Sequence, residues 1–216
     1  MGISPLSGIG DQADVSRITV GGLFLQKKVF GFDIDGVLTA DDDGRQNTWV
    51  VEAGRFFKKK PVRASFRLDE ALGLKKAEVE RFFRAKGHTI LAEVPVRTGC
   101  VDVLCELKNQ GHTVHLITAR NEGFRQITED WLQRHAIPYD SLTMNEAPHT
   151  AFGKGKVCRS LSVELFVDDN YENCLDIHRS GVPVLMYYAS HNRERHPFVP
   201  VVHDWDDIRS HIETIL

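Results

Sequence analysis

The chain has 216 residues, of which 42% are hydrophobic and 26% are charged, and its formal net charge at pH 7 is −3. This length fits one α/β domain with an insertion, and the composition excludes the disordered, fibrous and membrane-embedded classes. The small net charge gives no reason to expect binding to nucleic acid or to an anionic membrane, so any attraction for an anionic ligand must be local.

The N-terminal part, residues 1–27, is interpreted as an extension ahead of the core. Residues 1–12 lack the basic start and apolar run of a signal peptide, and no stretch approaches the roughly 18 apolar residues of a membrane span. We therefore expect a cytoplasmic protein. From Arg17 to Gln26, β-favouring residues interrupted by two glycines predict a strand or hairpin.

Residues 28–38 and 95–216 show the alternating pattern of an α/β core. The apolar run V-F-G-F before Asp33 predicts the first strand. Later strands are expected over 113–118, 141–144, 164–167 and 184–188, and helices over 98–109, 122–135 and from 156 to 161. The alternation predicts a Rossmann-like parallel sheet with helices on both faces. Residues 39–94 interrupt the pattern with polar segments at helical spacing, which predicts a small helical insertion.

Two acidic residues follow the first expected strand. Asp33 and Asp35, in D-I-D-G-V-L-T, lie at the carboxyl end of that strand, where open α/β sheets bind their ligands. Gly36 lets the chain turn there, so that both carboxylates can face one site. The string D-x-D-G also occurs in calcium loops and ordinary turns, so this motif alone does not decide between a site and a turn.

A second acidic pair, Asp168 and Asp169 in L-F-V-D-D-N, follows another apolar run. Carboxylates packed together repel each other unless a cation or a proton resolves the conflict, and oxygen ligands suit a hard ion. We therefore expect Mg²⁺ to be bound among Asp33, Asp35, Asp168 and Asp169. A solvated Asp-Asp turn is the alternative.

Donors for a phosphoryl group lie in two further segments. Thr118, in L-I-T-A-R, offers a hydroxyl, and backbone N–H groups of the turn at Ala119 and Arg120 can reach an oxyanion. In G-K-G-K, Lys154 can pair with both the nucleophile and the phosphate, and Lys156 competes for this role. Lys156, Ala119 and Arg120, together with Gly36, are the expected substrate contacts. Each residue alone would be interpreted as a turn residue or a solvated charge.

The motifs D-I-D-G-V-L-T, L-I-T-A-R, K-G-K-V-C-R-S-L and F-V-D-D-N-Y-E-N resemble, in order and spacing, those of the haloacid dehalogenase-like superfamily of phosphatases. The segments T-E-D-W-L-Q-R-H-A-I-P-Y-D-S-L and V-D-D-N-Y-E-N are similar, more narrowly, to its 5'(3')-deoxyribonucleotidase-like branch. The resemblance implies a magnesium-dependent phosphomonoester hydrolase that acts on a small-molecule phosphate ester.

The resemblance also implies roles for the acidic residues. Asp33 would attack phosphorus to give an aspartyl-phosphate, and Asp35 would protonate the leaving alkoxide and later deprotonate the attacking water. Magnesium would be held by Asp33, the backbone carbonyl of Asp35 and Asp169, with Asp168 as a second acidic contact. Many relatives carry a further acid where this chain has Asn173, so we expect the surroundings of the magnesium to be built differently here.

The insertion resembles a helical cap of this superfamily, a lid that excludes water and selects the leaving group. Its basic residues are candidates to meet an anionic substrate and its aromatic residues to stack on a base: Arg55, Lys58, Lys59, Lys60, Arg63 and Arg67, with Trp49, Phe56 and Phe57. The alternative is a solvated helix face and an aromatic cap core. The spacing of the nucleotidase-like branch favours Lys154 over Lys156 for the phosphate role.

A nucleoside monophosphate is the leading substrate class. The alternative within enzymes is a phosphatase for sugar phosphates or biosynthetic intermediates, because cap loops change specificity while the core stays fixed. Outside enzymes, the alternative is a non-catalytic module that binds a phosphorylated ligand. Neither a nucleic acid polymer nor a membrane is expected as a partner, and the sequence allows a homodimer.

Overall fold

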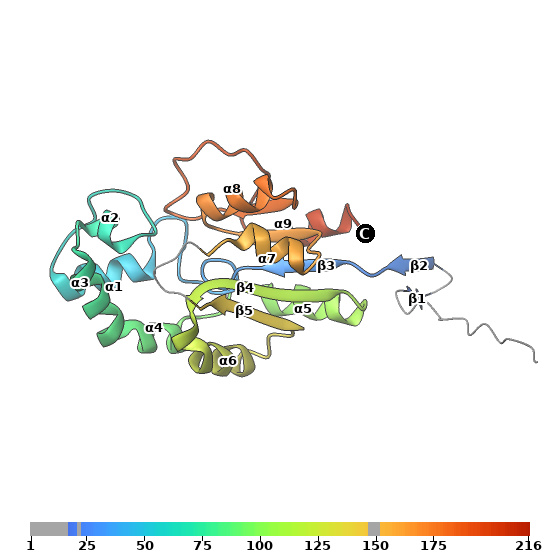
Figure 1. Cartoon of the computed structure of the whole chain (residues 1–216), viewed down its shortest axis with the longest axis horizontal. Helices are drawn as coiled ribbons and strands as arrows, with labels where there is room; N and C mark the ends of the chain where they lie inside the picture. Colours follow the sequence, from blue (N-terminus) through green and yellow to red (C-terminus); the bar gives the residue numbers. More distant parts are fainter. Residues whose placement is uncertain (1–16, 21–22, 147–151) are drawn as a thin grey trace, which may run out of the picture.

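A computed structural model gives the fold, and it describes residues 17–20, 23–146 and 152–216. Most of the expected N-terminal extension, residues 1–16, lies outside these ranges. Strands β1 (Arg17–Val20) and β2 (Leu23–Gln26) pair antiparallel, which confirms the hairpin predicted for this stretch. The hairpin lies at the opposite end of the molecule from the helices of the insertion (Figure 1).

The central sheet has six parallel strands in the order β5-β4-β3-β6-β7-β8. Their bounds are β3 (Val29–Phe32), β4 (Thr113–Asn121), β5 (Ser141–Asn145), β6 (Leu165–Asp168), β7 (Val184–Tyr187) and β8 (Val201–Val202). The chain first adds β4 and β5 on one side of β3 and then β6 to β8 on the other side. In such sheets ligands bind outside the carboxyl ends of the strands at this switch point.

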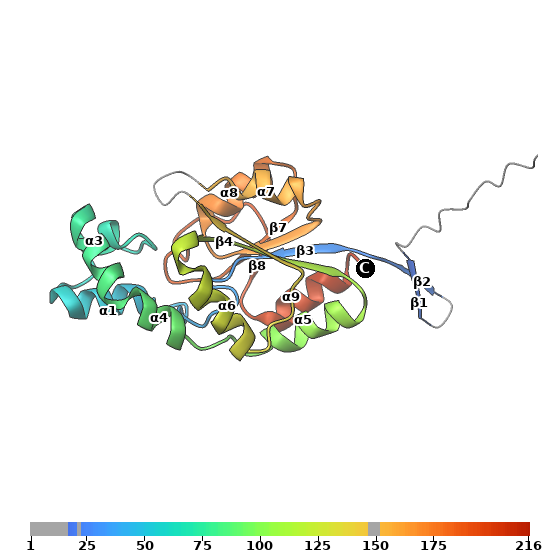
Figure 2. The same ribbon diagram turned by 60° about the horizontal axis from the view of Figure 1, so that its bottom comes forward.

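Helices cover both faces of the sheet, so the predicted Rossmann-like α/β architecture is confirmed. One face carries α5 (Cys100–Asn109), α6 (Arg125–Arg134) and α9 (Trp205–Glu213), and the other carries α7 (Lys154–Ser160) and α8 (Tyr171–Arg179) (Figure 2). Each face has its own buried apolar cluster, with Trp131 and Trp205 in the first and Phe166 in the second. Burial on both faces explains why the central strands are continuous apolar runs in the sequence.

The segment between β3 and α5 is helical, as its spacing predicts. It contains α1 (Thr48–Phe57), α2 (Leu68–Leu72), α3 (Lys76–Phe82) and α4 (His88–Glu93), and the π-helical turn η1 (Phe83–Gly87) joins the last two. These helices enclose a buried cluster of their own. The two connections to the core run antiparallel where Thr39 pairs with Val96. We therefore propose 39–94 as the cap, with 28–38 and 95–216 as the core.

All four cysteines are free thiols, with Cys100, Cys158 and Cys174 buried and Cys105 half-buried. Within the described ranges, no helix is both long enough and apolar enough to cross a membrane.

Gly155 allows α7 to approach α8 closely. A Cβ atom at Gly155 would lie 2.7 Å from the Asp176 main-chain oxygen, whereas a Cβ at Gly153 would meet no described atom within 4 Å. We expect Gly155→Ala to lower the free energy of unfolding by about 1–3 kcal/mol, because the two helices must separate. Thermal unfolding of Gly155→Ala, with Gly153→Ala as the control, measures this effect. Equal unfolding temperatures for the two variants would show that the contact is not limiting.

Candidate active site

The acidic motifs meet at the carboxyl ends of β3 and β6. Phe32 pairs with Val167 in two neighbouring strands, and Asp33 and Asp168 are the residues that follow this pair. The Asp33 N–H donates to the Val167 carbonyl at 2.9 Å, which continues the pairing of the two strands to the site. Adjacent parallel strands thus place the two acidic motifs at the same edge of the sheet.

Asp33, Asp168 and Asp169 form a buried carboxylate cluster. Each offers an oxygen within 4.8 Å of the others, and their exposed fractions are 5%, 0% and 8%. Burial raises the pKa of Asp33 to about 7 against the opposing effect of Lys154, and burial also raises the pKa of Asp169 well above its usual value. Oxygen donors in this number and spacing fit a hard divalent cation such as Mg²⁺.

Lys154 is fully buried between two of these carboxylates. Its Nζ lies 2.8 Å from Asp33 Oδ2 and 2.7 Å from Asp168 Oδ2. Burial alone would lower the pKa of Lys154, but the two carboxylates outweigh it and raise the pKa above its usual value. The ammonium group therefore stays charged. Lys156, two residues further along the same helix, is exposed, so the structure brings Lys154 rather than Lys156 to the carboxylates.

Arg120 forms a bidentate ion pair with Asp35. Its Nε lies 2.8 Å from Asp35 Oδ2 and its Nη2 lies 2.6 Å from Asp35 Oδ1, while Nη1 donates to Thr128. Arg120 is buried. Its side chain, expected as a substrate contact, therefore binds Asp35 in this structure. Thr118 is also buried, and its Oγ1 accepts from the Arg120 N–H at 3.2 Å.

Gly36 makes room for Asp169. Its φ is +75°, in the left-handed region that favours glycine, and a Cβ atom there would lie 1.9 Å from Asp169 Oδ2. The Gly36 N–H donates to Thr39 Oγ1 at 3.0 Å and to Asp41 Oδ1 at 2.8 Å. This N–H is therefore occupied within the loop, so the contribution of Gly36 lies in the turn and in its close approach to Asp169.

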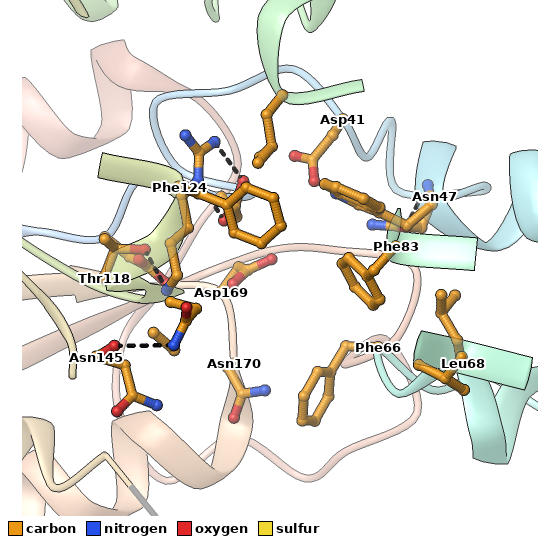
Figure 3. Close-up of a pocket in the computed structure, with 18 of the residues that line it drawn as sticks. Asp41, Asn47, Phe66, Leu68, Phe83, Thr118, Phe124, Asn145, Asp169 and Asn170 are labelled. Atoms are coloured by element: carbon orange, nitrogen blue, oxygen red, sulfur yellow. Dashed lines mark hydrogen bonds and ion pairs between the residues drawn. The ribbon is translucent and has the colours of Figure 1, made fainter. Parts of the chain in front are cut away.

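A cavity of about 680 Å³ lies between this cluster and the helical insertion (Figure 3). The core contributes its polar floor: Asp33, Asp35, Asp169, Thr118, Ala119 and Arg120. The insertion contributes most of its apolar wall: Trp49, Phe66, Leu68, Val79, Phe83 and Leu91, to which the core adds Phe124. Five amide side chains also line the cavity: Asn47, Asn121, Asn145, Asn170 and Asn173.

The cap residues selected from the sequence lie mostly away from this cavity. Among them only Trp49 lines it. Phe56 and Phe57 pack on each other and on Phe82, which agrees with the alternative of a cap core. The basic candidates Arg55, Arg63 and Arg67 form exposed ion pairs with neighbouring acids, and Lys58, Lys59 and Lys60 are exposed. The cations of the cap that line the cavity are Lys76 and Arg84.

Sequence reasoning missed the cavity-lining face of α3 and η1. Lys76, Val79, Glu80, Phe83 and Arg84 line the cavity and recur at spacings of three and four, the spacing of one helix face. That periodicity was the available signal. It does not say whether the face turns towards the core or towards solvent, which depends on how the cap packs.

Side chains from α8 and from the loop after β7 hold Asp168 and Asp169. Asn173 Nδ2 donates to both Asp168 carboxylate oxygens, at 3.2 and 3.3 Å. Asn192 Nδ2 donates to the Asp169 carbonyl at 2.7 Å, and His191 Nε2 lies 3.1 Å from the same oxygen. The position where many relatives carry an acid is thus occupied by an amide donor. His191 and Asn192 lie in the loop after β7 and have no motif that could have singled them out.

Asp41 is a further buried acid at the cavity, also missed by sequence reasoning. It is 3% exposed, and its Oδ1 accepts from the Gly36 N–H and from Thr39 Oγ1, each at 2.8 Å. Burial, together with the charge of Asp35, raises the pKa of Asp41 to about 6. An acid following a strand by eight residues carries no local signal of burial.

The raised pKa of Asp41 predicts a pH-dependent cost to stability. The pKa is about 6 in the folded chain and near 3.8 when unfolded, so the cost is absent below pH 3.8 and grows as the pH rises through 6. Asp41→Asn should therefore raise the free energy of unfolding at pH 8, by up to about 3 kcal/mol, and change it little near pH 4. Thermal unfolding across this range, with the exposed Asp43→Asn as control, measures the effect. A gain that does not vary with pH would contradict this origin.

The chain is similar to known proteins both in sequence and in fold. No protein-family model matches the chain. A nucleotidase of Clostridium acetobutylicum is 25% identical over 180 residues, covering 82% of this chain and 88% of that protein. A haloacid dehalogenase-like family hydrolase from Streptococcus pneumoniae has the same fold, with a TM-score of 0.61 and 15% identity over 86% of this chain and 98% of that one.

A second solved structure has the same fold. A subfamily IA hydrolase of the haloacid dehalogenase superfamily from Geobacter sulfurreducens has a TM-score of 0.55 and 15% identity, covering 86% of this chain and 96% of that one. The two solved structures confirm the fold that the motifs predict, and the nucleotidase from Clostridium acetobutylicum agrees with the narrower resemblance to a nucleotidase-like branch.

Proposed function

We propose that this chain, which has the haloacid dehalogenase-like fold, is a magnesium-dependent phosphomonoester hydrolase that forms an aspartyl-phosphate on Asp33. The observation that carries the proposal is the buried cluster at the floor of the cavity. Asp33 lies there beside Asp168 and Asp169, with Lys154 bridging the first two at 2.8 and 2.7 Å. Three carboxylates and one ammonium leave a net negative charge that a divalent cation would balance.

The nucleophile is held in place from both sides. Asp33 Oδ1 accepts from the Ile34 N–H at 2.7 Å and Oδ2 contacts Lys154. Asp33, Asp169 and the Asp35 carbonyl would hold the magnesium, with Asp168 as a second acidic contact. When bound, the cation would keep Asp33 ionised and polarise a phosphoryl oxygen. An ionised carboxylate then attacks phosphorus without a general base.

Donors around the cluster would bind the phosphoryl oxygens. Thr118 and Ala119 line the same cavity as Asp33, and the Thr118 hydroxyl and the Ala119 N–H are the proposed donors. Lys154 keeps two of its ammonium hydrogens for Asp33 and Asp168, which leaves one for a phosphoryl oxygen. Such preorganised donors stabilise charge that develops in the transition state.

Asp35 is the proposed acid and base. It would give a proton to the leaving alkoxide and later take one from the attacking water. In the free protein Arg120 binds both oxygens of its carboxylate. Because Arg120 occupies both carboxylate oxygens, the proposal requires this contact to lengthen when the substrate enters, so that Asp35 can reach the leaving oxygen.

A nucleoside monophosphate is the proposed substrate class. The cavity, at about 680 Å³, has the size of a typical small-molecule site, and aromatic rings form its wall above the carboxylates. Trp49 and Phe83 lie 5.2 Å apart between ring centroids, at an angle of 32°. Flat aromatic surfaces of this kind favour a base over a sugar. The name of the Clostridium acetobutylicum relative supports the same choice. A sugar phosphate remains the alternative within this reaction.

The reaction chemistry can be tested with a generic aryl phosphate. Asp33→Asn and Lys154→Met should each lower kcat at least about a thousandfold, because they remove the nucleophile and the cation between the carboxylates. Lys156→Met, a matched change two residues away, should stay within about threefold of the wild type. EDTA should abolish turnover and Mg²⁺ should restore it. Wild-type turnover no higher than that of Asp33→Asn would favour the non-catalytic binding module.

The substrate class can be tested at the aromatic wall. Trp49→Ala should raise KM for a nucleoside monophosphate about tenfold and change KM for a small phosphate ester much less, since stacking on a base contributes about 1–1.5 kcal/mol. Phe56→Ala, on the outer face of the cap, should change neither KM by more than about twofold. Release of phosphate from a substrate panel gives the ranking. Preference for sugar phosphates over every nucleotide would overturn the choice of substrate.

A further inference from the structure

We propose that Asp41 is a specificity residue that accepts a hydrogen bond from a hydroxyl group of the leaving alcohol, so that the preferred substrates are hydroxylated esters such as ribonucleotides. This inference rests on the proposed phosphatase function and deepens it, because it names a chemical feature that the alcohol part of the substrate must carry. It concerns a residue outside the carboxylate cluster and its bridging lysine.

The first observation is an uncommitted carboxylate oxygen at the cavity. Both hydrogen bonds to the Asp41 side chain, from Gly36 and Thr39, end on Oδ1. Oδ2 has no hydrogen-bond or ion-pair partner among the residues that the structure describes. The residue is 3% exposed and lines the cavity. The buried unpartnered side-chain atoms of the described residues are His112 Nε2 and His191 Nδ1, so Asp41 Oδ2 is open to the cavity and can accept a hydrogen bond from a ligand there.

The second observation is that the nearby cations are already occupied. Arg120 uses its guanidinium on Asp35 and Thr128. Arg97 donates to the main-chain oxygens of Gly36 and Asp42, at 3.0 and 2.8 Å. In the described chain, Asp41 therefore forms no ion pair, although the charge of Arg97 partly offsets the effect of its burial. Its free oxygen is available to a group that enters the cavity.

The third observation is a hydrogen-bond donor next to Asp41. The chain turns back over residues 41–48, where Asp42 pairs with Asn47 and the Thr48 N–H donates to the Asp41 carbonyl at 2.7 Å. Asn47 Oδ1 caps α1 by accepting from the Trp49 and Val50 N–H groups. Its Nδ2 has no partner in the described part of the chain. Figure 3 shows Asp41 and Asn47 on the same side of the cavity, close to Phe83.

An acceptor and a donor on the same side of the cavity match a hydroxyl group. A hydroxyl donates one hydrogen bond and accepts others, so it can give its hydrogen to Asp41 Oδ2 and receive one from Asn47 Nδ2. The pair lies beside Trp49, which is proposed to contact the base. A sugar hydroxyl between the base and the phosphate is therefore the group that this arrangement fits.

The test compares esters that differ by one hydroxyl group. Wild-type turnover of an aryl phosphate with Mg²⁺ is measured first. The values of kcat/KM are then compared for adenosine 5'-monophosphate and its 2'-deoxy and 3'-deoxy analogues, and for glucose 6-phosphate and 2-deoxyglucose 6-phosphate. We expect at least one hydroxylated member to be favoured about tenfold or more, since a hydrogen bond to a charged group is among the stronger ones.

Variants assign this preference to Asp41. The ratio of kcat/KM for the hydroxylated ester to that for its deoxy analogue should fall to within about twofold of one in Asp41→Ala. Asp41→Asn retains an acceptor for Gly36 and removes the charge, so it should leave an intermediate ratio and guards against loss of folding in the alanine variant. Asp43→Asn, an exposed acid two residues away, should keep the wild-type ratio. Because the readout is a ratio, a general loss of structure or rate does not imitate the effect.

Calorimetric binding of adenosine and its two deoxy analogues gives the same comparison without turnover. Inactive wild-type protein that still binds adenosine more tightly than a deoxy analogue would contradict the proposed function and support this inference. If the wild-type protein is active but does not distinguish hydroxylated from deoxy esters in kcat/KM, this inference alone is overturned. The same holds if Asp41→Ala leaves the wild-type preference unchanged. Tighter binding of 2'-amino-2'-deoxyadenosine than of adenosine, lost in Asp41→Ala, would overturn the hydroxyl assignment in favour of an amine.

Discussion

The balance between three buried carboxylates and one buried ammonium determines how this end of the molecule is built. Asp33 and Asp168 come from adjacent strands and could not remain buried side by side without Lys154 between them. Lys154 can reach both because its helix packs closely on α8, where Gly155 has no side chain. Gly36 in turn lets the loop after β3 pass against Asp169. The positions of two glycines thus follow from an electrostatic requirement.

The strands and the acidic cluster were predictable because their signals are local. An apolar run followed directly by acids fixes both the strand and the edge at which the acids lie. The choice between Lys154 and Lys156 could not be made from local pattern alone, since both stand in G-K-G-K and the helix orientation decides. The pairing of Arg120 with Asp35 joins residues 85 positions apart, so no local pattern could indicate it, and the contact of Arg120 with substrate stays a prediction.

The sequence predicts that the insertion is helical, but it does not predict which helix faces line the cavity. Its basic and aromatic residues are distributed over several faces, and only the packing of the insertion decides which face meets the cavity. Phe57 packs against the buried cluster of the cap and Phe56 lies exposed beside it, whereas Phe83 and Arg84 in the π-helical turn meet the cavity. A π turn shifts the register of side chains along a helix, and such turns are frequent at functional sites. The cavity therefore combines a charged floor from the core with an aromatic wall from the insertion.

The antiparallel pairing of Thr39 with Val96 means that only two chain segments connect the insertion to the sheet. Everything between these crossings encloses its own apolar interior. Helices in that interval can change with little effect on the ionic arrangement beneath, whereas Asp41 and Asp42 at its start bond to Gly36 and Ser190 of the core. A lineage with this architecture can therefore acquire new metabolic roles by rewriting one continuous stretch of its gene.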